Sequence, residues 1–317
     1  MRIIERIEDI EKPFESAVVT IGNFDGVHIG HQNLFHQVVQ HAAQLRGTAV
    51  AITFEPHPLR VLSDNRYPPL ITLTEQKKEL IAATELDVLL LIPFTRAFAE
   101  IPADVFVEDL LVKRIGMKAI IVGPDYAFGK NRAGDLHLLK KMGAAQGFEL
   151  IISDWINAAH GREDRISSTR IRDLVMAGDV TSARRLLGRC YQVRGTVVRG
   201  RNRGGKLLGF PTANLQLQDE LCPQTGIYAV KVDCAGQLRQ GVANIGYSPT
   251  FGDHQFTVEV HILDFKEDLY GQKIKVNFVQ RIREEIKFDS LEALSAQIRQ
   301  DIAIAREIIQ SNGLNGN

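Results

Sequence analysis

The sequence lacks the features that mark several large classes of protein. It has only three cysteines, Cys190, Cys222 and Cys234, without any C-x-x-C spacing. Neither a disulfide framework nor a zinc knuckle is therefore supported. Lysine plus arginine equal aspartate plus glutamate, 38 of each. No global field draws such a chain to nucleic acid or to an acidic membrane, so any anion site must be local.

Long apolar runs are also missing. No run approaches the ~18 residues of a membrane-spanning helix, and the charged residues of the opening MRIIERIEDIEKPFES exclude the core of a signal peptide. The sequence predicts a cytoplasmic protein with no membrane or nucleic-acid partner, either a monomer or a weak homo-oligomer. A length of 317 residues, 44% of them hydrophobic, is enough for two domains with cores of their own.

The first part of the chain, residues 1–187, alternates short apolar runs with helical patterns. The runs are nearly continuous in apolar character, which is typical of parallel strands covered on both faces. They are Ala17–Ile21, Thr48–Phe54, Val88–Ile92, Ala119–Val122 and Phe148–Ile152. Helices are expected between them, beginning at Gln32, Thr74, Pro102 and Asp135. This alternation predicts an open α/β sheet that binds its ligands beyond the carboxyl ends of the strands.

The pattern changes at Gly188. Alternating strands punctuated by glycine and proline follow: YQVRGTVV, GIYAVKVDC, QGVANIGY, TVEVHILDF and KIKVNFVQ. They predict a second domain, residues 188–317, built as a small closed antiparallel β-barrel, because closure removes the exposed edges of a short sheet. A terminal helix is expected from Asp289, with Glu292 completing a capping box, to about Gln310.

The stretch GNFDGVHIGHQ, residues 22–32, joins the first strand to the first helix of the α/β domain. Unpaired amides and the helix dipole make such a junction an anion site, and His28 and His31 reach the same ligand from one turn. A histidine pair here can neutralise charge that grows on a phosphate during transfer. One alternative is a metal site, but the sequence places no third ligand at a fixed spacing from the two histidines. The other alternative is that both histidines are surface residues without a function.

The barrel domain carries a second constellation, which begins in the glycine- and cation-rich loop GRNRGGKL, residues 200–207. Leu207 stands where a P-loop needs serine or threonine, which excludes a P-loop NTPase. The following LGFPTANL places Thr212 and Asn214 two apart on an extended chain, hence on one face. Hard oxygen ligands of this kind suit Mg²⁺ that bridges phosphates. Glu259 lies between two valines on an alternating strand. Its carboxylate either points into the barrel, where burial would require a function or a partner, or points outward into solvent.

Four motifs of the first domain resemble one family. GNFDGVHIGHQ, FEPHP (54–58), GPDYAFGKNRAGD (123–135) and ISSTRIR (166–172) are similar, in this order, to the flavin adenylyltransferase module of prokaryotic bifunctional riboflavin kinase/FAD synthetases. The resemblance implies a Rossmann-like parallel sheet of the nucleotidylyltransferase type. One departure is Ile29, where many relatives carry a basic residue, which puts an extra phosphate contact in doubt but not the histidine pair.

The resemblance also implies roles for residues of the first domain. The ATP phosphates would contact His28 and His31, in a pocket shaped by Gly22, Asn23, Asp25 and Gly30. A second phosphate grip would come from Ser167, Ser168, Thr169 and Arg170, with Arg170 counted among the catalytic residues. Flavin would bind near Phe54, His57, Asp125 and Phe128, because a flat ring system needs aromatic or apolar faces.

The second domain resembles riboflavin kinase over essentially all of residues 188–310. LGFPTANL, TGIYAV, NIGYSPTFG, VEVHILDF and RIREEIKF carry this resemblance. It implies Thr212 and Asn214 at the magnesium–ATP site, and Glu259 as the base that takes the proton from the ribityl 5′-hydroxyl. It also implies Lys206, Gly209 and Pro211 near the nucleotide. Arg283 would contact the flavin, with Arg281 as an equal alternative.

Together the two resemblances imply one chain with two active sites. The barrel would phosphorylate riboflavin to FMN, and the α/β domain would join FMN and ATP into FAD with release of pyrophosphate. Riboflavin, FMN and ATP are then substrates, and Mg²⁺ is the cofactor. Two alternatives are a nucleotidylyltransferase for another phosphorylated substrate and a non-catalytic regulator that binds nucleotides or RNA through the arginines near residue 200.

Overall fold

The computed structural model describes residues 1–63, 67–156, 165–199, 209–218, 220–234, 236–247 and 256–311. Its contacts divide the chain into two compact units, Met1–Ser168 and Thr169–Asn317. This division lies earlier than the Leu187/Gly188 boundary predicted from the sequence, because two helices that follow Ser167 pack with the second unit.

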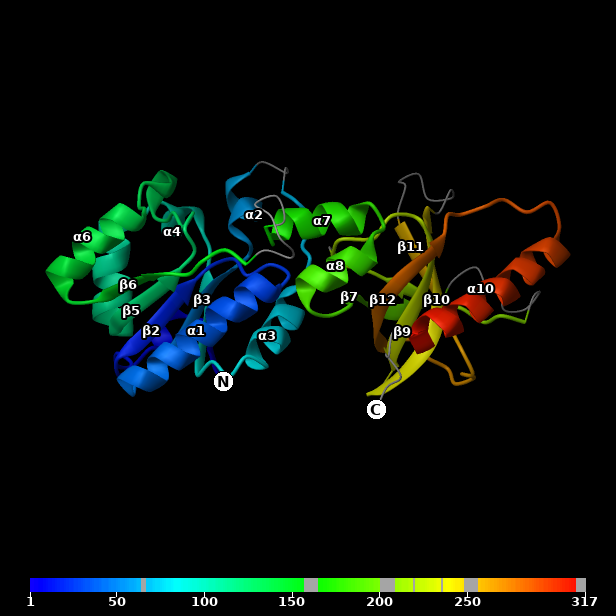
Figure 1. Ribbon diagram of the computed structural model, residues 1–317, viewed down its shortest axis with the longest axis horizontal. Helices are drawn as coiled ribbons and strands as arrows, with labels where there is room; N and C mark the ends of the chain where they lie inside the picture. Colours follow the sequence, from blue (N-terminus) through cyan, green and yellow to red (C-terminus); the bar gives the residue numbers. More distant parts are fainter. Residues whose placement is uncertain are drawn as a thin grey trace. The chain divides into compact units, whose positions relative to one another are not determined.

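The first unit is built on a six-stranded parallel sheet with the order β1-β4-β3-β2-β5-β6. Its strands are β1 (Arg2–Ile4), β2 (Ala17–Ile21), β3 (Ala49–Glu55), β4 (Val88–Pro93), β5 (Met117–Val122) and β6 (Glu149–Ile152). Figure 1 labels β3, β2, β5 and β6 of this sheet. The predicted strands are present within two residues at each end. β1 was not predicted, because its three residues show no apolar run and it forms only by pairing with β4 at the sheet edge.

Helices cover both faces of this sheet. Buried side chains of α1 (Ile29–Leu45) and α3 (Thr74–Ala82) pack on one face. The other face is covered by the π-helix η2 (Phe106–Ile115) and by α6 (Leu136–Gln146). The shorter helices are η1 (Ile7–Asp9), α2 (Pro58–Leu62), α4 (Arg96–Ala99), α5 (Ala103–Val105) and η3 (Lys130–Arg132).

The strand order contains one switch point. The chain runs from β2 through β3 to β4 in one direction, and then returns to place β5 on the other side of β2. Crossovers therefore leave in opposite directions from β2 and β5, which opens a crevice beyond their carboxyl ends. The GNFDGVHIGHQ stretch follows β2 at this point.

The second unit contains a closed barrel with the order β10-β11-β8-β7-β12-β9. Its antiparallel strands are β7 (Tyr191–Val198), β8 (Ala213–Gln216), β9 (Gly226–Cys234), β10 (Gln237–Tyr247), β11 (Phe256–Ile262) and β12 (Lys273–Arg283). The open parallel sheet and the closed barrel confirm the predicted α/β plus β fold class.

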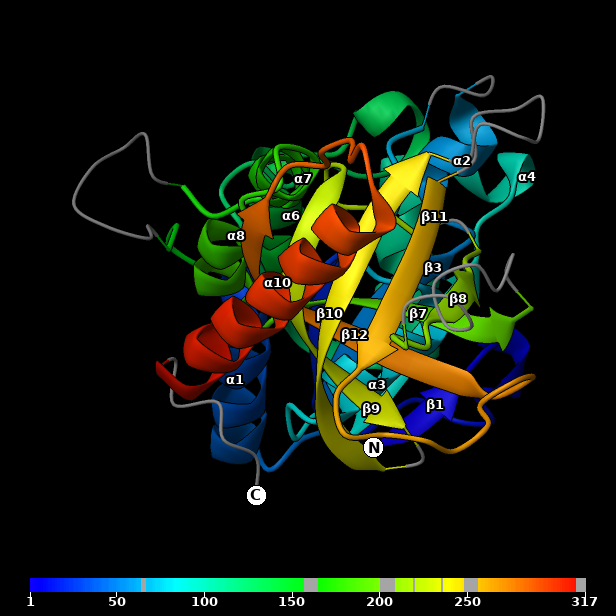
Figure 2. The same ribbon diagram turned by 90° about the vertical axis from the view of Figure 1, so that its right-hand side faces the viewer.

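The described residues of the second unit also form the helices α7, α8 and α10. α7 (Ser168–Met176) and α8 (Val180–Leu187) precede the barrel, and α8 packs on β12 and β7. α10 (Leu291–Ser311) lies across the outer face of the barrel, where Ala305 and Ile309 pack against Ala229 and Val279 (Figure 2). The terminal helix is therefore confirmed. Its cap differs from the predicted one, since Ser290 Oγ accepts the hydrogen bond from the Ala293 amide.

No helix in the described ranges combines the length and the apolar character that crossing a membrane requires.

Candidate functional sites

A pocket of about 270 Å³ lies at the switch point of the parallel sheet. Its lining comes from the loops that follow β2, β5 and β6 and from the start of α1. The lining residues include Gly22, His28, Gly30, His31, Asp125, Tyr126, Trp155, Arg165, Ser167 and Ser168. The sequence stretches 22–32, 123–135 and 166–172 thus meet at one place, although they lie far apart in the chain.

The two predicted histidines, His28 and His31, both line this pocket. His28 is the N-cap of α1, and its Nδ1 accepts a hydrogen bond of 3.3 Å from the amide of His31. The rings stack with centroids 3.6 Å apart and an angle of 16° between their planes. The helix therefore begins earlier than predicted, at Ile29. The stacked pair stands at its N-terminus, where amides and the helix dipole favour an anion.

His31 is held in its neutral form. Burial lowers the pKa of His31 well below 6.5, and the charges of His28 and Lys77 lower that pKa further. Its Nδ1 is buried with no hydrogen-bond partner among the described residues. His31 therefore lines the pocket as an uncharged ring.

Glycines allow the tight packing of the histidine loop. A Cβ atom at Gly30 would lie 3.1 Å from the His28 ring, and one at Gly22 would lie 2.7 Å from the Phe24 ring. Gly26 has a φ of +85°, a conformation that strains other residues.

In the described part of the chain, no group of three histidines, cysteines or carboxylates is placed to hold a metal ion.

Asp25 and Asn23 shape the loop from behind. The buried Asp25 carboxylate accepts hydrogen bonds from the amides of Ile71 and Thr72 and from the Thr72 hydroxyl, at 3.1–3.2 Å. The carbonyl of Asn23 accepts a hydrogen bond from Thr53 Oγ1 at 3.2 Å. Neither residue is among those that line the pocket, and the shaping role that the resemblance implies for them stays a prediction.

Replacing Asp25 with alanine should lower the stability of the first unit. The substitution leaves two buried backbone donors without an acceptor, which costs about 2 to 4 kcal/mol of unfolding free energy. The single tryptophan of the sequence, Trp155, lies in this unit, so its fluorescence in a urea titration reports on this unit. Asp25→Asn, which keeps one acceptor oxygen, should lose less. An unchanged midpoint for Asp25→Ala would refute the structural role.

The ISSTRIR motif contributes to the pocket only in part. Ser167 and Ser168 line it, and Ser168 Oγ donates a hydrogen bond of 2.8 Å to the carbonyl of Asp25. Thr169 and Arg170 lie in α7 at the start of the second unit and are not among the lining residues. The role expected for these two residues stays a prediction.

The residues predicted to bind flavin separate into two groups. Asp125 lines the pocket, but three others pack elsewhere. Phe54 packs against Phe94 and Phe98, and the buried Phe128 stacks on Tyr126. The buried His57 is the N-cap of α2 and accepts the Leu59 amide at 3.2 Å. These three side chains are therefore part of the core or of a helix cap in this structure.

Sequence reasoning missed the aromatic wall of the pocket. Trp155 follows β6, and the Arg165 guanidinium lies 3.2 Å from the centre of its ring. Arg165 also pairs with Asp125 at 2.7 Å, and Tyr126 stands beside Asp125. The only signals were that Trp155 is the single tryptophan and that it follows a predicted strand.

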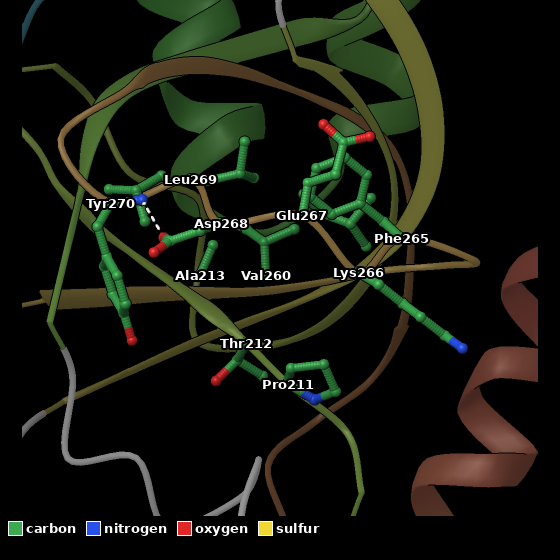
Figure 3. A pocket seen from close by; sticks show the side chains of 12 residues that line it. Pro211, Thr212, Ala213, Val260, Phe265, Lys266, Glu267, Asp268, Leu269 and Tyr270 are labelled. Carbon is green, nitrogen blue, oxygen red and sulfur yellow. Dashed lines mark hydrogen bonds between the residues drawn. The ribbon is translucent and has the colours of Figure 1, made fainter.

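The barrel has a cavity of about 220 Å³ next to the PTAN segment (Figure 3). Inward-facing side chains of β7, β8 and β11 form one side, and residues 265–270 form the other. In this loop the Tyr270 amide donates a hydrogen bond of 2.8 Å to the Asp268 carboxylate. Pro211 and Thr212 stand at the rim, and the Pro211 carbonyl is hydrogen-bonded to His261 Nδ1 at 2.8 Å. Gly209 is exposed, and Lys206 lies outside the described residues.

Glu259 faces the outside of the barrel. Its neighbours Val258 and Val260 are buried with the inward-facing Ile245 and Ala243. Glu259 itself pairs across the sheet with Asn214 and Asn244. The prediction of an inward-pointing carboxylate is therefore wrong. The carboxylate is not fully solvated either, because burial raises the pKa of Glu259, and the nearby Glu285 carboxylate raises that pKa further.

Replacing Glu285 with glutamine should shift the pH dependence of any reaction in which Glu259 accepts a proton. The ionised form of Glu259 is the active one, so the rate falls as the pH drops through its raised pKa. Removing the like charge of Glu285 lowers that pKa, and the acid limb of the rate profile should move to lower pH. A profile that stays in place would show that Glu259 is not the titrating group.

The donors at this site fit a magnesium ion. Thr212 immediately precedes β8, Asn214 lies on that strand, and Glu259 is the direct cross-strand partner of Asn214. The hydroxyl of Thr212 and the amide oxygen of Asn214 are hard ligands, which Mg²⁺ accepts together with phosphate oxygens, and the Glu259 carboxylate stands beside them. The barrel therefore brings together a set of side chains suited to a metal–nucleotide complex.

The two arginines predicted as alternatives for flavin both make structural contacts. Arg283 forms a two-pronged ion pair with the buried Asp301 of α10, at 2.9 and 2.7 Å. Arg281 donates a hydrogen bond of 2.7 Å to the carbonyl of Thr225. Arg283 thus fastens α10 to the barrel, and the flavin contact expected of either residue stays a prediction.

The two units carry the equipment of group transfer from nucleotides. One presents stacked histidines at a helix N-terminus, and the other a half-buried carboxylate beside hard oxygen ligands. Both arrangements are suited to positioning phosphates and stabilising charge. The fold and the sites therefore define a two-site nucleotide-dependent transferase.

Comparison with known proteins identifies the family. The family model of FAD synthetase matches residues 10–170, and that of riboflavin kinase matches residues 187–309. A bifunctional riboflavin kinase/FMN adenylyltransferase of Escherichia coli is 38% identical over 97% of this chain and 97% of its own length. One from Haemophilus influenzae is 36% identical over 98% and 100%. The chain belongs to the family of bifunctional riboflavin kinase/FMN adenylyltransferases.

A solved structure covers nearly the whole chain. It is a Streptococcus pneumoniae protein described as a macrolide-efflux protein, with a TM-score of 0.86 and 32% identity over 96% of this chain and 98% of that one. The fold described above therefore recurs in a solved structure.

Proposed function

We propose that this chain performs both reactions of its family in sequence. The barrel, within residues 188–317, phosphorylates riboflavin with ATP to give FMN. The parallel-sheet domain, within residues 1–187, transfers the adenylyl group of a second ATP to FMN, which gives FAD and pyrophosphate. The matches of two different family models to the two parts of the chain support this division.

In adenylyl transfer, a phosphate oxygen of FMN attacks the α-phosphorus of ATP and pyrophosphate leaves. The amides at the start of α1 and the rings of His28 and His31 hydrogen-bond the ATP phosphates as negative charge grows on them. Ser167 lines the pocket and would supply a hydroxyl for the departing pyrophosphate, while Ser168 holds the loop through its bond to the Asp25 carbonyl. The ring of Trp155 offers an aromatic face to a planar group of either substrate.

In riboflavin phosphorylation, the ribityl 5′-hydroxyl attacks the γ-phosphorus of ATP. Glu259 accepts the hydroxyl proton as the bond to phosphorus forms, and its half-buried setting favours this role because burial raises its pKa. The cavity beside Thr212 is proposed to hold the nucleotide. Mg²⁺ held by Thr212 and Asn214 would neutralise phosphate charge.

The observation that carries the proposal is the stacked histidine pair at the switch point of a sheet, in a chain of this family. ATP labelled at the α-phosphate, incubated with FMN, should yield labelled FAD. ATP labelled at the γ-phosphate, incubated with riboflavin, should yield labelled FMN. An α-label that reaches no flavin would overturn the first assignment, and a γ-label left on free phosphate would overturn the second.

A further inference from the structure

A buried lysine lies behind the histidine pocket. Lys77 is in the first turns of α3, and only 5% of its surface is exposed. Its ammonium donates hydrogen bonds to the carbonyl of Asn23 at 3.2 Å and to Thr53 Oγ1 at 3.4 Å. Burying a charged lysine is costly unless hydrogen bonds or nearby charges compensate for the lost hydration. The two proposed reactions assign no role to Lys77.

The contacts of Lys77 converge on the histidine loop. Asn23 lies in the turn between β2 and α1, and its carbonyl also accepts a hydrogen bond from Thr53 Oγ1 of β3. Two donors from two different elements therefore meet at one carbonyl oxygen. The same turn is held on its other side by Asp25, through the backbone of residues 71 and 72 just before α3. Fixing Asn23 and Asp25 fixes the start of α1 and hence the positions of both histidines.

We propose that Lys77 is a positioning residue for adenylyl transfer, which fixes the loop of the histidine pair and keeps a positive charge beside it. The inference rests on the proposed function of this pocket. Lys77 is not among the residues that line the pocket, so its effect passes through the loop and through its charge.

The charges around the pocket agree with this role. Burial lowers the pKa of Lys77, whereas Glu55 and Asp25 raise it and so favour the ammonium form. The groups that act on His31 are His28 and Lys77, both of which lower its pKa. Asp125 and Arg165 pair with each other on the other side of the pocket. A fixed cation behind a neutral histidine lets the site attract polyphosphate while the imidazole stays available for hydrogen bonding.

The test compares Lys77→Met with Lys78→Met. Both remove one positive charge from neighbouring positions of α3, but Lys78 pairs with Glu5 and Glu75 at the surface. In Lys77→Met, kcat for conversion of FMN to FAD should fall by about tenfold or more, since small displacements of catalytic groups have large effects. The pKa of His31, followed by NMR of its ring, should rise. Lys78→Met should leave both unchanged, and riboflavin phosphorylation should be normal in all variants.

Lys77→Gln separates the two roles and serves if Lys77→Met fails to fold. Glutamine can still donate to the Asn23 carbonyl but carries no charge, so the pKa of His31 should rise while kcat is partly recovered. An unchanged pKa of His31 and an unchanged kcat in either Lys77 variant would overturn the inference. If the wild-type chain makes no FAD, the proposed function fails, and the His31 titration still decides whether Lys77 acts on the pair.

Discussion

Replacing His28 and His31 together with alanine is expected to abolish the conversion of FMN to FAD. The two rings stack at the N-terminus of α1, and both residues line the pocket. Loss of one preorganised donor to a developing negative charge costs a hundredfold to a thousandfold in kcat. The double variant should therefore lose roughly a thousandfold or more in FAD formation, measured by chromatography of the flavins.

The same preparation contains its own control. Phosphorylation of riboflavin should continue at nearly the wild-type rate, because the histidines belong to a different compact unit from the barrel. His36→Ala, an exposed histidine on the same helix α1, should leave both reactions unchanged. Equal loss of both activities in the double variant would contradict the division of labour between the two units.

Glu259→Gln should have the opposite effect and stop phosphorylation of riboflavin. Glutamine keeps the shape and the cross-strand position between Asn214 and Asn244 but cannot accept the proton of the attacking hydroxyl. Loss of a general base lowers the rate by about a hundredfold to ten-thousandfold. FMN formation from riboflavin should fall by this factor, whereas FMN supplied directly should still be converted to FAD.

A matched variant controls for the removal of a carboxylate from the second unit. Glu292→Gln removes an exposed carboxylate from the first turn of α10 and should leave the kinase reaction unchanged. If Glu259→Gln retained its rate of FMN formation, the carboxylate would not be the proton acceptor, and the barrel site would have to act by positioning alone.

The features that could be predicted from the sequence are those that local residue patterns determine, namely the strands and the turn that carries the histidine pair. Continuous apolar runs marked the central strands of the parallel sheet, because strands covered on both faces need apolar residues at every position. The turn from β2 into α1 identified the histidine pair, because chain order alone puts a strand end and a helix start together. Alternating residues with glycine and proline marked the strands of the barrel.

Long-range contacts could not be predicted in the same way. The alternating pattern around Glu259 gave two opposite faces, and only the burial of Val258 and Val260 inside the closed barrel showed that the Glu259 side chain points outward. Phe54 and Phe128 were candidates for flavin binding, but they pack with other phenylalanines that lie far away in sequence. Lys77 carried no local signal, since a lysine in a polar helix is ordinarily solvated.

The central claim is that one chain carries out two consecutive transfers at two separate sites. The most direct measurement is to incubate the purified chain with riboflavin, ATP and Mg²⁺ and to follow the flavins by chromatography over time. FMN should rise first and then give way to FAD. FMN that accumulates without FAD would contradict the role of the histidine pocket, and the absence of any new flavin would contradict both assignments.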